Sequence, residues 1–152
     1  MRSHATAARE SPGRLGQVSL RALVVAGLAV DAYVHLHLAG SYDANTAAIS
    51  QGALFRVEAV AAVVAALLVL VTRGRPGLLV AFLVAAGGVG AVLLYQYMDL
   101  GALGPLPDMY EPVTYPEKTF SLVAEAVAAL AALALLLMHL RRHRARHDPA
   151  GA

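Results

Sequence analysis

The chain has 152 residues, of which 59% are hydrophobic and only 14% are charged. A soluble domain is typically about a quarter charged, so a water-soluble fold of this composition would expose larger apolar patches than soluble monomers tolerate. The formal net charge is +2, but the basic residues fall in short clusters beside apolar runs, which argues against nucleic-acid binding. The chain has no cysteine, which excludes disulfides, thiolate metal sites, iron–sulfur clusters and thiol redox catalysis.

Four apolar stretches approach the roughly 20 residues that an α-helix needs to cross about 30 Å of hydrocarbon. In chain order they cover residues 20–39, 53–71, 78–97 and 120–140. An Arg-Gly-Arg-Pro-Gly turn separates the second stretch from the third, and the outer loop 98–119 contains four prolines, which stop a helix from continuing. The sequence therefore predicts an all-α fold, a four-helix transmembrane bundle formed by residues 20–140.

The segments on either side of the bundle are predicted to be a disordered cytoplasmic arm, 1–19, and a basic cytoplasmic tail, 141–152. Arginine and lysine near the ends of spans favour the cytoplasmic side of a membrane. Four spans place ten arginines on one side, namely Arg2, Arg9, Arg14, Arg21, Arg73, Arg75, Arg141, Arg142, Arg144 and Arg146. The other side receives Lys118, and Arg56 lies just inside the second span. This asymmetry predicts a multi-pass protein of the inner (plasma) membrane with both termini in the cytoplasm (N-in/C-in).

The first span also has features of a cleaved signal peptide, because basic residues precede it and small residues follow it. However, its apolar stretch is long and carries Asp31, His35 and His37 near its exit. Signal peptides rarely hold such residues in their apolar region, so we expect the first span to remain in the protein.

The polar residues inside the predicted spans include Asp31, His35, Glu58, Tyr95 and Glu125. An ionised side chain at the centre of a bilayer costs about 2.5–3.5 kcal/mol on insertion scales, so these residues are expected to face one another or water. At 1.5 Å per helical residue, all five lie roughly 3–12 Å below the outer boundary. Alanine or glycine shares the helix face of each residue, and small residues mark close helix contacts. The sequence therefore predicts one polar cluster in the outer half of the bundle.

The cluster has several interpretations, which the sequence leaves open. Asp31, His35, Glu58 and Glu125 supply enough ligands for one divalent metal ion. Asp31, His35 and Tyr95 are suitable donors for a quinone-type ligand among apolar walls. Arg56 is a candidate ion-pair partner of Glu58, in which case the cluster is structural, and the carboxylates alone are candidates for an ion or proton path. A bis-His haem is disfavoured because His35 and His37 both lie on the first span.

The sequence does not favour an enzyme, because it shows neither a nucleophile triad nor a phosphate-binding glycine loop. The leading interpretation is an accessory or structural subunit in the lipid bilayer, as a homo-oligomer or part of a membrane complex. The alternatives are a redox-linked protein that binds quinone or metal, and a small ion or proton transporter. The loop 98–119 is either a stiff cap over the polar cluster or an ordinary connector.

The segment Ala-Val-Asp-Ala-Tyr-Val-His-Leu-His-Leu at 29–38 and the segment Met-Tyr-Glu-Pro at 109–112 are the most distinctive parts of the sequence. With them, the chain resembles uncharacterised small integral membrane proteins of actinobacteria over most of its length. The four-span layout with a cytoplasmic N-terminal arm is also similar to the DoxX-like group. That second resemblance rests on layout and implies an association with quinone-linked redox systems.

Overall fold

The computed structural model describes residues 12–72 and 74–147, with side chains between 14 and 142. In this part of the chain the elements are α1 (Pro12–Ala39), the short 3-10 helix η1 (Gly40–Tyr42), α2 (Gln51–Val71), α3 (Arg75–Tyr97) and α4 (Pro116–His147). Each of the four α-helices is long and apolar enough to cross a membrane. The predicted fold class, an all-α four-helix bundle, is confirmed.

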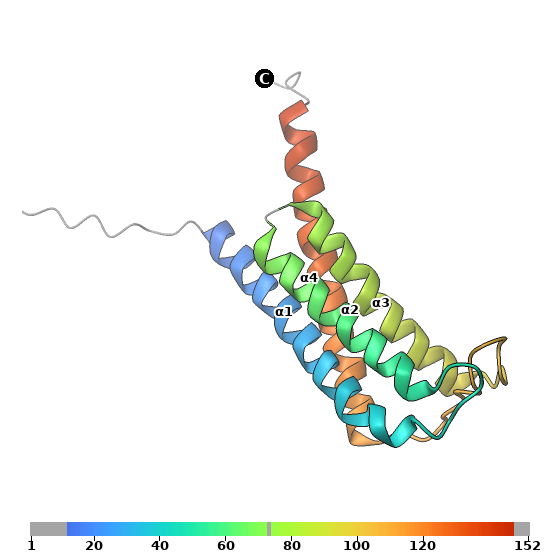
Figure 1. The fold of residues 1–152 in the computed structure, drawn as a ribbon. Helices are drawn as coiled ribbons and strands as arrows, with labels where there is room; N and C mark the ends of the chain where they lie inside the picture. Colours follow the sequence, from blue (N-terminus) through green and yellow to red (C-terminus); the bar gives the residue numbers. More distant parts are fainter. Residues whose placement is uncertain (1–11, 73, 148–152) are drawn as a thin grey trace, which may run out of the picture.

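The four helices form an antiparallel bundle (Figure 1). Helix α1 packs against α2 and α4, and α3 packs against the same two helices, so α1 and α3 lie on a diagonal. The start of α1, the end of α2, the start of α3 and the C-terminal part of α4 are at the same end of the bundle, and we call this the terminal end. The opposite end, which we call the loop end, carries the two longer connections 40–50 and 98–115.

Two helices extend well beyond the predicted spans. Helix α1 begins at Pro12, so the predicted disordered arm is corrected for residues 12–19, and α4 continues to His147. Hydropathy measures the length of chain that suits hydrocarbon, whereas a helix can continue into the interface, where water satisfies its end groups. Residues 1–11 of the predicted arm and 148–152 of the predicted tail lie outside the described residues.

The core of the terminal-end half is built from small and aliphatic side chains. The largest of its fully buried members are Val24, Leu28, Val69, Leu78 and Leu135. The helices come close because small residues line their contacts. A Cβ atom on Gly27 would lie only 2.6 Å from the carbonyl oxygen of Ala124, so the contact between α1 and α4 requires glycine at this position.

Large apolar side chains also cover the outside of the bundle. Leu23, Val60, Leu83 and Leu130, one on each helix, are 47%, 62%, 60% and 68% exposed. Such a surface is suited to lipid tails rather than to water. The fold is therefore consistent with a multi-pass membrane protein in contact with a lipid bilayer.

Candidate functional site

A buried acidic centre lies between α1 and α4 in the loop-end half. The side chains of Asp31 and Glu125 are both 0% exposed. The hydroxyl oxygen of Ser121 lies between them, 3.0 Å from Asp31 Oδ1 and 3.2 Å from Glu125 Oε1. His35 adds an imidazole, whose Nδ1 is 2.7 Å from Asp31 Oδ1. We call these four residues the acidic centre.

Helical spacing explains how the acidic centre is assembled. Asp31 and His35 are four residues apart on α1, as are Ser121 and Glu125 on α4, so each pair shares one helix face. Helix α3 leaves space for the carboxyl group, because a Cβ atom on Gly88 would lie 2.7 Å from Glu125 Oε1. The predicted cluster thus depends on a small residue in a third helix.

Three carboxyl oxygens in and beside the acidic centre lack a hydrogen-bond partner within the described residues. Asp31 Oδ2, Glu58 Oε1 and Glu125 Oε2 are buried and have no hydrogen-bond partner within the described residues. A hydroxyl group has a single proton, so Ser121 can donate to only one of its two carboxyl neighbours at a time. Buried polar atoms of this kind are rare and costly, and they often mark an ion, a water molecule or a functional role.

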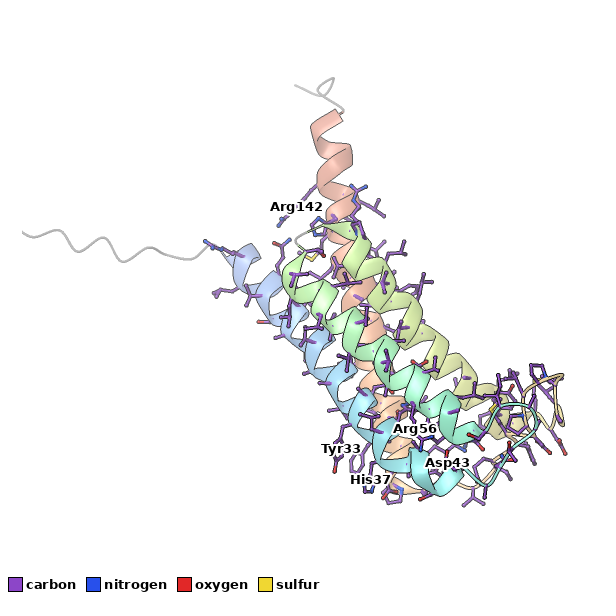
Figure 2. All side chains as sticks on the ribbon, viewed as in Figure 1. Tyr33, His37, Asp43, Arg56 and Arg142 are labelled. Atoms are coloured by element: carbon purple, nitrogen blue, oxygen red, sulfur yellow. The ribbon has the colours of Figure 1, made fainter. Side chains whose placement is uncertain are left out.

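Arg56 does not neutralise the acidic centre. Its guanidinium group donates two hydrogen bonds of 2.7 Å to the carboxylate of Asp43, at the loop end, and Figure 2 shows the two side chains together there. The predicted ion pair of Arg56 with Glu58 is therefore corrected. Arg56 and Glu58 are two positions apart on α2, so their side chains point about 200° apart. Asp43 directly follows η1 and lies within reach of Arg56. The guanidinium group lowers the pKa of Asp43 below its usual value.

The other cation nearby, Lys118, is also engaged elsewhere. Its ammonium group donates to the backbone carbonyl oxygens of Glu111 and Val113. These contacts fasten the end of the 98–115 connection to the first turn of α4. Lys118 therefore stabilises a loop, and its hydrogen bonds are directed to neutral acceptors.

A cavity of about 250 Å³ lies beside the acidic centre. Its wall is mostly apolar and includes Leu54, Phe55 and Val92, and its polar members include His35, Glu58 and Tyr95. Asp31 and Glu125 lie behind this wall, in contact with His35 and Ser121, which both line the cavity. Pockets for small molecules commonly combine apolar walls with a few polar groups in this way.

The two loop-end connections cover the cavity and are joined to each other. Asn45 Nδ2 donates to the carbonyl oxygen of Asp108 at 2.7 Å, and the Ile49 amide donates to the carbonyl oxygen of Pro105 at 3.1 Å. The hydroxyl groups of Tyr42 and Tyr115 lie 2.9 Å apart.

Both of these tyrosines line the cavity, and Met109 and Glu111 also contribute to its wall. Burial and the hydrogen bond with Tyr42 raise the pKa of Tyr115. Of the two interpretations of the loop, these contacts favour a cap.

Within the described residues, the buried polar side chains gather in the loop-end half. They are the side chains of Asp31, Gln51, Lys118, Ser121 and Glu125, which lie toward the loop ends of α1, α2 and α4. The buried core beyond them consists of Val, Leu and Ala side chains.

The structure divides the predicted site residues into two groups. Asp31, His35 and Glu125 come together, and each offers one possible metal ligand atom, all within 4.8 Å of one another. Glu58 and Tyr95 are not part of this group and line the cavity instead. His37 stacks on Tyr33 with the ring centroids 5.9 Å apart (Figure 2).

Sequence reasoning did not assign roles in the site to Ser121, Gly88, Tyr42 and Tyr115. Ser121 had a recognisable signal, because it lies four residues before Glu125 on the same helix face. The tyrosine pair had none, since it joins segments that are 73 residues apart in the chain.

No family model matches the chain, no curated protein matches it, and no solved structure matches it. The function is therefore argued from the geometry of the acidic centre and the cavity.

Proposed function

We propose that this chain is a multi-pass protein of the plasma membrane, with both termini in the cytoplasm, that binds a small lipid-soluble ligand of the quinone type. The orientation is supported by the described arginines at the terminal end, Arg14, Arg21, Arg75, Arg141 and Arg142. This orientation places the cavity on the outer side of the membrane. Arg73 and the side chains of Arg2, Arg9, Arg144 and Arg146, which contribute to the same prediction, lie outside the described residues.

The observation that carries the proposal is the cavity, because it combines space for a small molecule, mostly apolar walls and a small number of hydrogen-bonding groups. A quinone is a flat ring with carbonyl oxygens at its edge. Phe55 and Val92 offer an apolar surface for such a ring, and His35 and Tyr95 offer polar atoms for its oxygens.

The position of His35 suits both redox forms of such a ligand. Its Nδ1 is engaged with Asp31 at 2.7 Å, which leaves Nε2 for the cavity. When His35 is neutral, Nε2 accepts a hydrogen bond from a quinol hydroxyl group, and when His35 is protonated, Nε2 donates to a quinone carbonyl oxygen. The carboxylate of Asp31 fixes the tautomer in the same way as a carboxylate behind a catalytic histidine.

The test is equilibrium binding of a short-chain benzoquinone to the purified full-length protein in lipid nanodiscs. We expect saturable binding to the wild type. We also expect about a 2- to 10-fold weaker affinity in Tyr95→Phe, because one hydrogen bond contributes about 0.5–1.5 kcal/mol. Tyr97→Phe is the matched control, since Tyr97 is 74% exposed on the same helix, and it should bind like the wild type.

A second pair of variants tests the cavity itself. Ala91 lines the cavity, so Ala91→Leu fills part of its volume and should weaken binding by at least tenfold. Ala29→Leu makes the same change at an exposed position of α1 and should not alter binding. If the wild type does not saturate, or if Ala91→Leu binds like Ala29→Leu, the cavity is not a quinone site. An accessory or structural subunit is then the better conclusion.

A further inference from the structure

We infer that Asp31, His35 and Glu125 form a binding site for one divalent transition-metal cation, such as Zn²⁺ or Mn²⁺. The site lies behind the cavity wall and is distinct from the ring-binding space. This inference does not rest on the proposed function, because Asp31 and Glu125 do not line the cavity, although His35 contributes to both sites.

The first argument is the geometry of the possible ligand atoms. The three residues each offer one such atom, and these atoms lie within 4.8 Å of one another. Two ligands that bind one ion at about 2.1 Å lie at most about 4.2 Å apart. Three ligands around one ion lie closer, about 3.4 Å apart at tetrahedral angles, so the widest pair must close by up to about 1.4 Å, which rotation of the carboxyl groups supplies.

The second argument is the set of unpartnered atoms. Asp31 Oδ2 and Glu125 Oε2 belong to side chains that are 0% exposed, and neither has a hydrogen-bond partner within the described residues. Buried carboxylates are normally paired with a cation or bound to a metal. Two carboxylate oxygens and one imidazole nitrogen are also a donor set that Zn²⁺, Mn²⁺ and Fe²⁺ accept.

The third argument is the balance of charge. Three carboxyl groups, those of Asp31, Glu58 and Glu125, lie near a single imidazole. Arg56 is paired with Asp43, and Lys118 donates to backbone carbonyl oxygens, so neither side chain compensates these acids. Positive charge must come from protons or from a bound cation, because unpaired charges are costly in a bundle with apolar surroundings.

A proton held by the carboxyl groups and Ser121 is the competing arrangement, and it predicts no metal dependence. The experiment begins with full-length protein purified in detergent and stripped with a chelator. Zn²⁺ or Mn²⁺ is then added, and bound metal is measured by mass spectrometry beside the midpoint of thermal unfolding. We expect about one ion per chain and a midpoint that rises with the concentration of the metal.

The variants Asp31→Asn and Glu125→Gln keep the shape of the site and remove one ligand charge each. We expect each to lower the affinity for metal by at least tenfold and to abolish the rise in the midpoint. In chelator Glu125→Gln should be at least as stable as the wild type, because it removes a buried carboxyl group that has no basic side chain beside it. This measurement separates the loss of a ligand from a failure to fold.

The two histidines of α1 supply the matched control. His35→Gln should lose metal, whereas His37→Gln should keep it, because His37 is exposed and stacks on Tyr33. Metal below about a tenth of an ion per chain in the wild type would overturn the inference. Equal metal content in the wild type and Asp31→Asn would do the same. Quinone binding is measured separately, so either proposal can fail while the other stands.

Discussion

The two halves of the bundle use the same four helices in different ways. In the terminal-end half, the buried core is made of Val, Leu and Ala side chains. In the loop-end half, two fully buried carboxyl groups, an imidazole and a cavity of about 250 Å³ interrupt this core. Close packing without polar atoms holds membrane helices together. The packing of the terminal-end half can therefore offset the free-energy cost of burying polar groups in the loop-end half. Proteins that depart from their own packing pattern usually do so at functional sites.

Two glycines make different kinds of close contact with neighbouring positions of α4. A Cβ atom on Gly27 would meet the backbone carbonyl oxygen of Ala124 at 2.6 Å, whereas one on Gly88 would meet the carboxyl group of Glu125 at 2.7 Å. A backbone atom moves only with its helix, but a carboxyl group can rotate. The same substitution at these two positions therefore separates helix packing from the arrangement of the acidic centre.

The largest effect on stability is expected for Gly27→Ala. Its new methyl group forces α1 away from α4, and overpacking of this kind typically costs about 1–3 kcal/mol. Gly90→Ala is the control, because a Cβ atom there has nothing within 4 Å, and it should be neutral or stabilising by up to about 1 kcal/mol. The free energy of unfolding is measured by denaturant titration in mixed micelles. Equal stability of the two variants would contradict the close contact between α1 and α4.

A smaller loss of stability is expected for Gly88→Ala, together with a change in the site. The new methyl group displaces the carboxyl group of Glu125, so the variant should lose less stability than Gly27→Ala but bind metal at least tenfold more weakly. Gly90→Ala is again the control, now for metal affinity. If Gly88→Ala bound metal like Gly90→Ala, Glu125 would not be a ligand.

The sequence was sufficient to predict the fold class and to bring together three of the five residues of the predicted polar cluster. Hydropathy shows the four helices, and helical periodicity places Asp31, His35 and Glu125 on inward faces at similar depth. It could not predict the partner of Arg56, because Asp43 lies in a connection whose path depends on contacts such as Asn45 with Asp108. The sequence also did not predict where the helices begin and end, because hydropathy reports the length of the apolar stretch rather than the extent of the helical backbone hydrogen bonds.

The smallest effect concerns the pair of Arg56 and Asp43, which lies at the loop end outside the acidic centre. Because the pKa of Asp43 is lowered in the folded protein, the pair stabilises the fold above the unfolded pKa of about 3.9, and this contribution is lost as the pH falls through the lower, folded value. The side chains of Arg56 and Asp43 are 48% and 46% exposed, so solvent and salt screen their attraction.

We therefore expect Asp43→Asn to lower the midpoint of thermal unfolding slightly at pH 6, and to match the wild type at a pH well below 3.9. Arg56→Gln removes the other partner and should show the same pH dependence, and the double variant should lose little more than either single variant. A difference between wild type and Asp43→Asn that stays constant from pH 6 to acidic pH would show that Asp43 acts through its hydrogen bond with Ser50 or its packing instead of its charge. Because the pair is screened, high salt should reduce the effect at pH 6, whereas the effect of Gly27→Ala, which depends on packing, should not change.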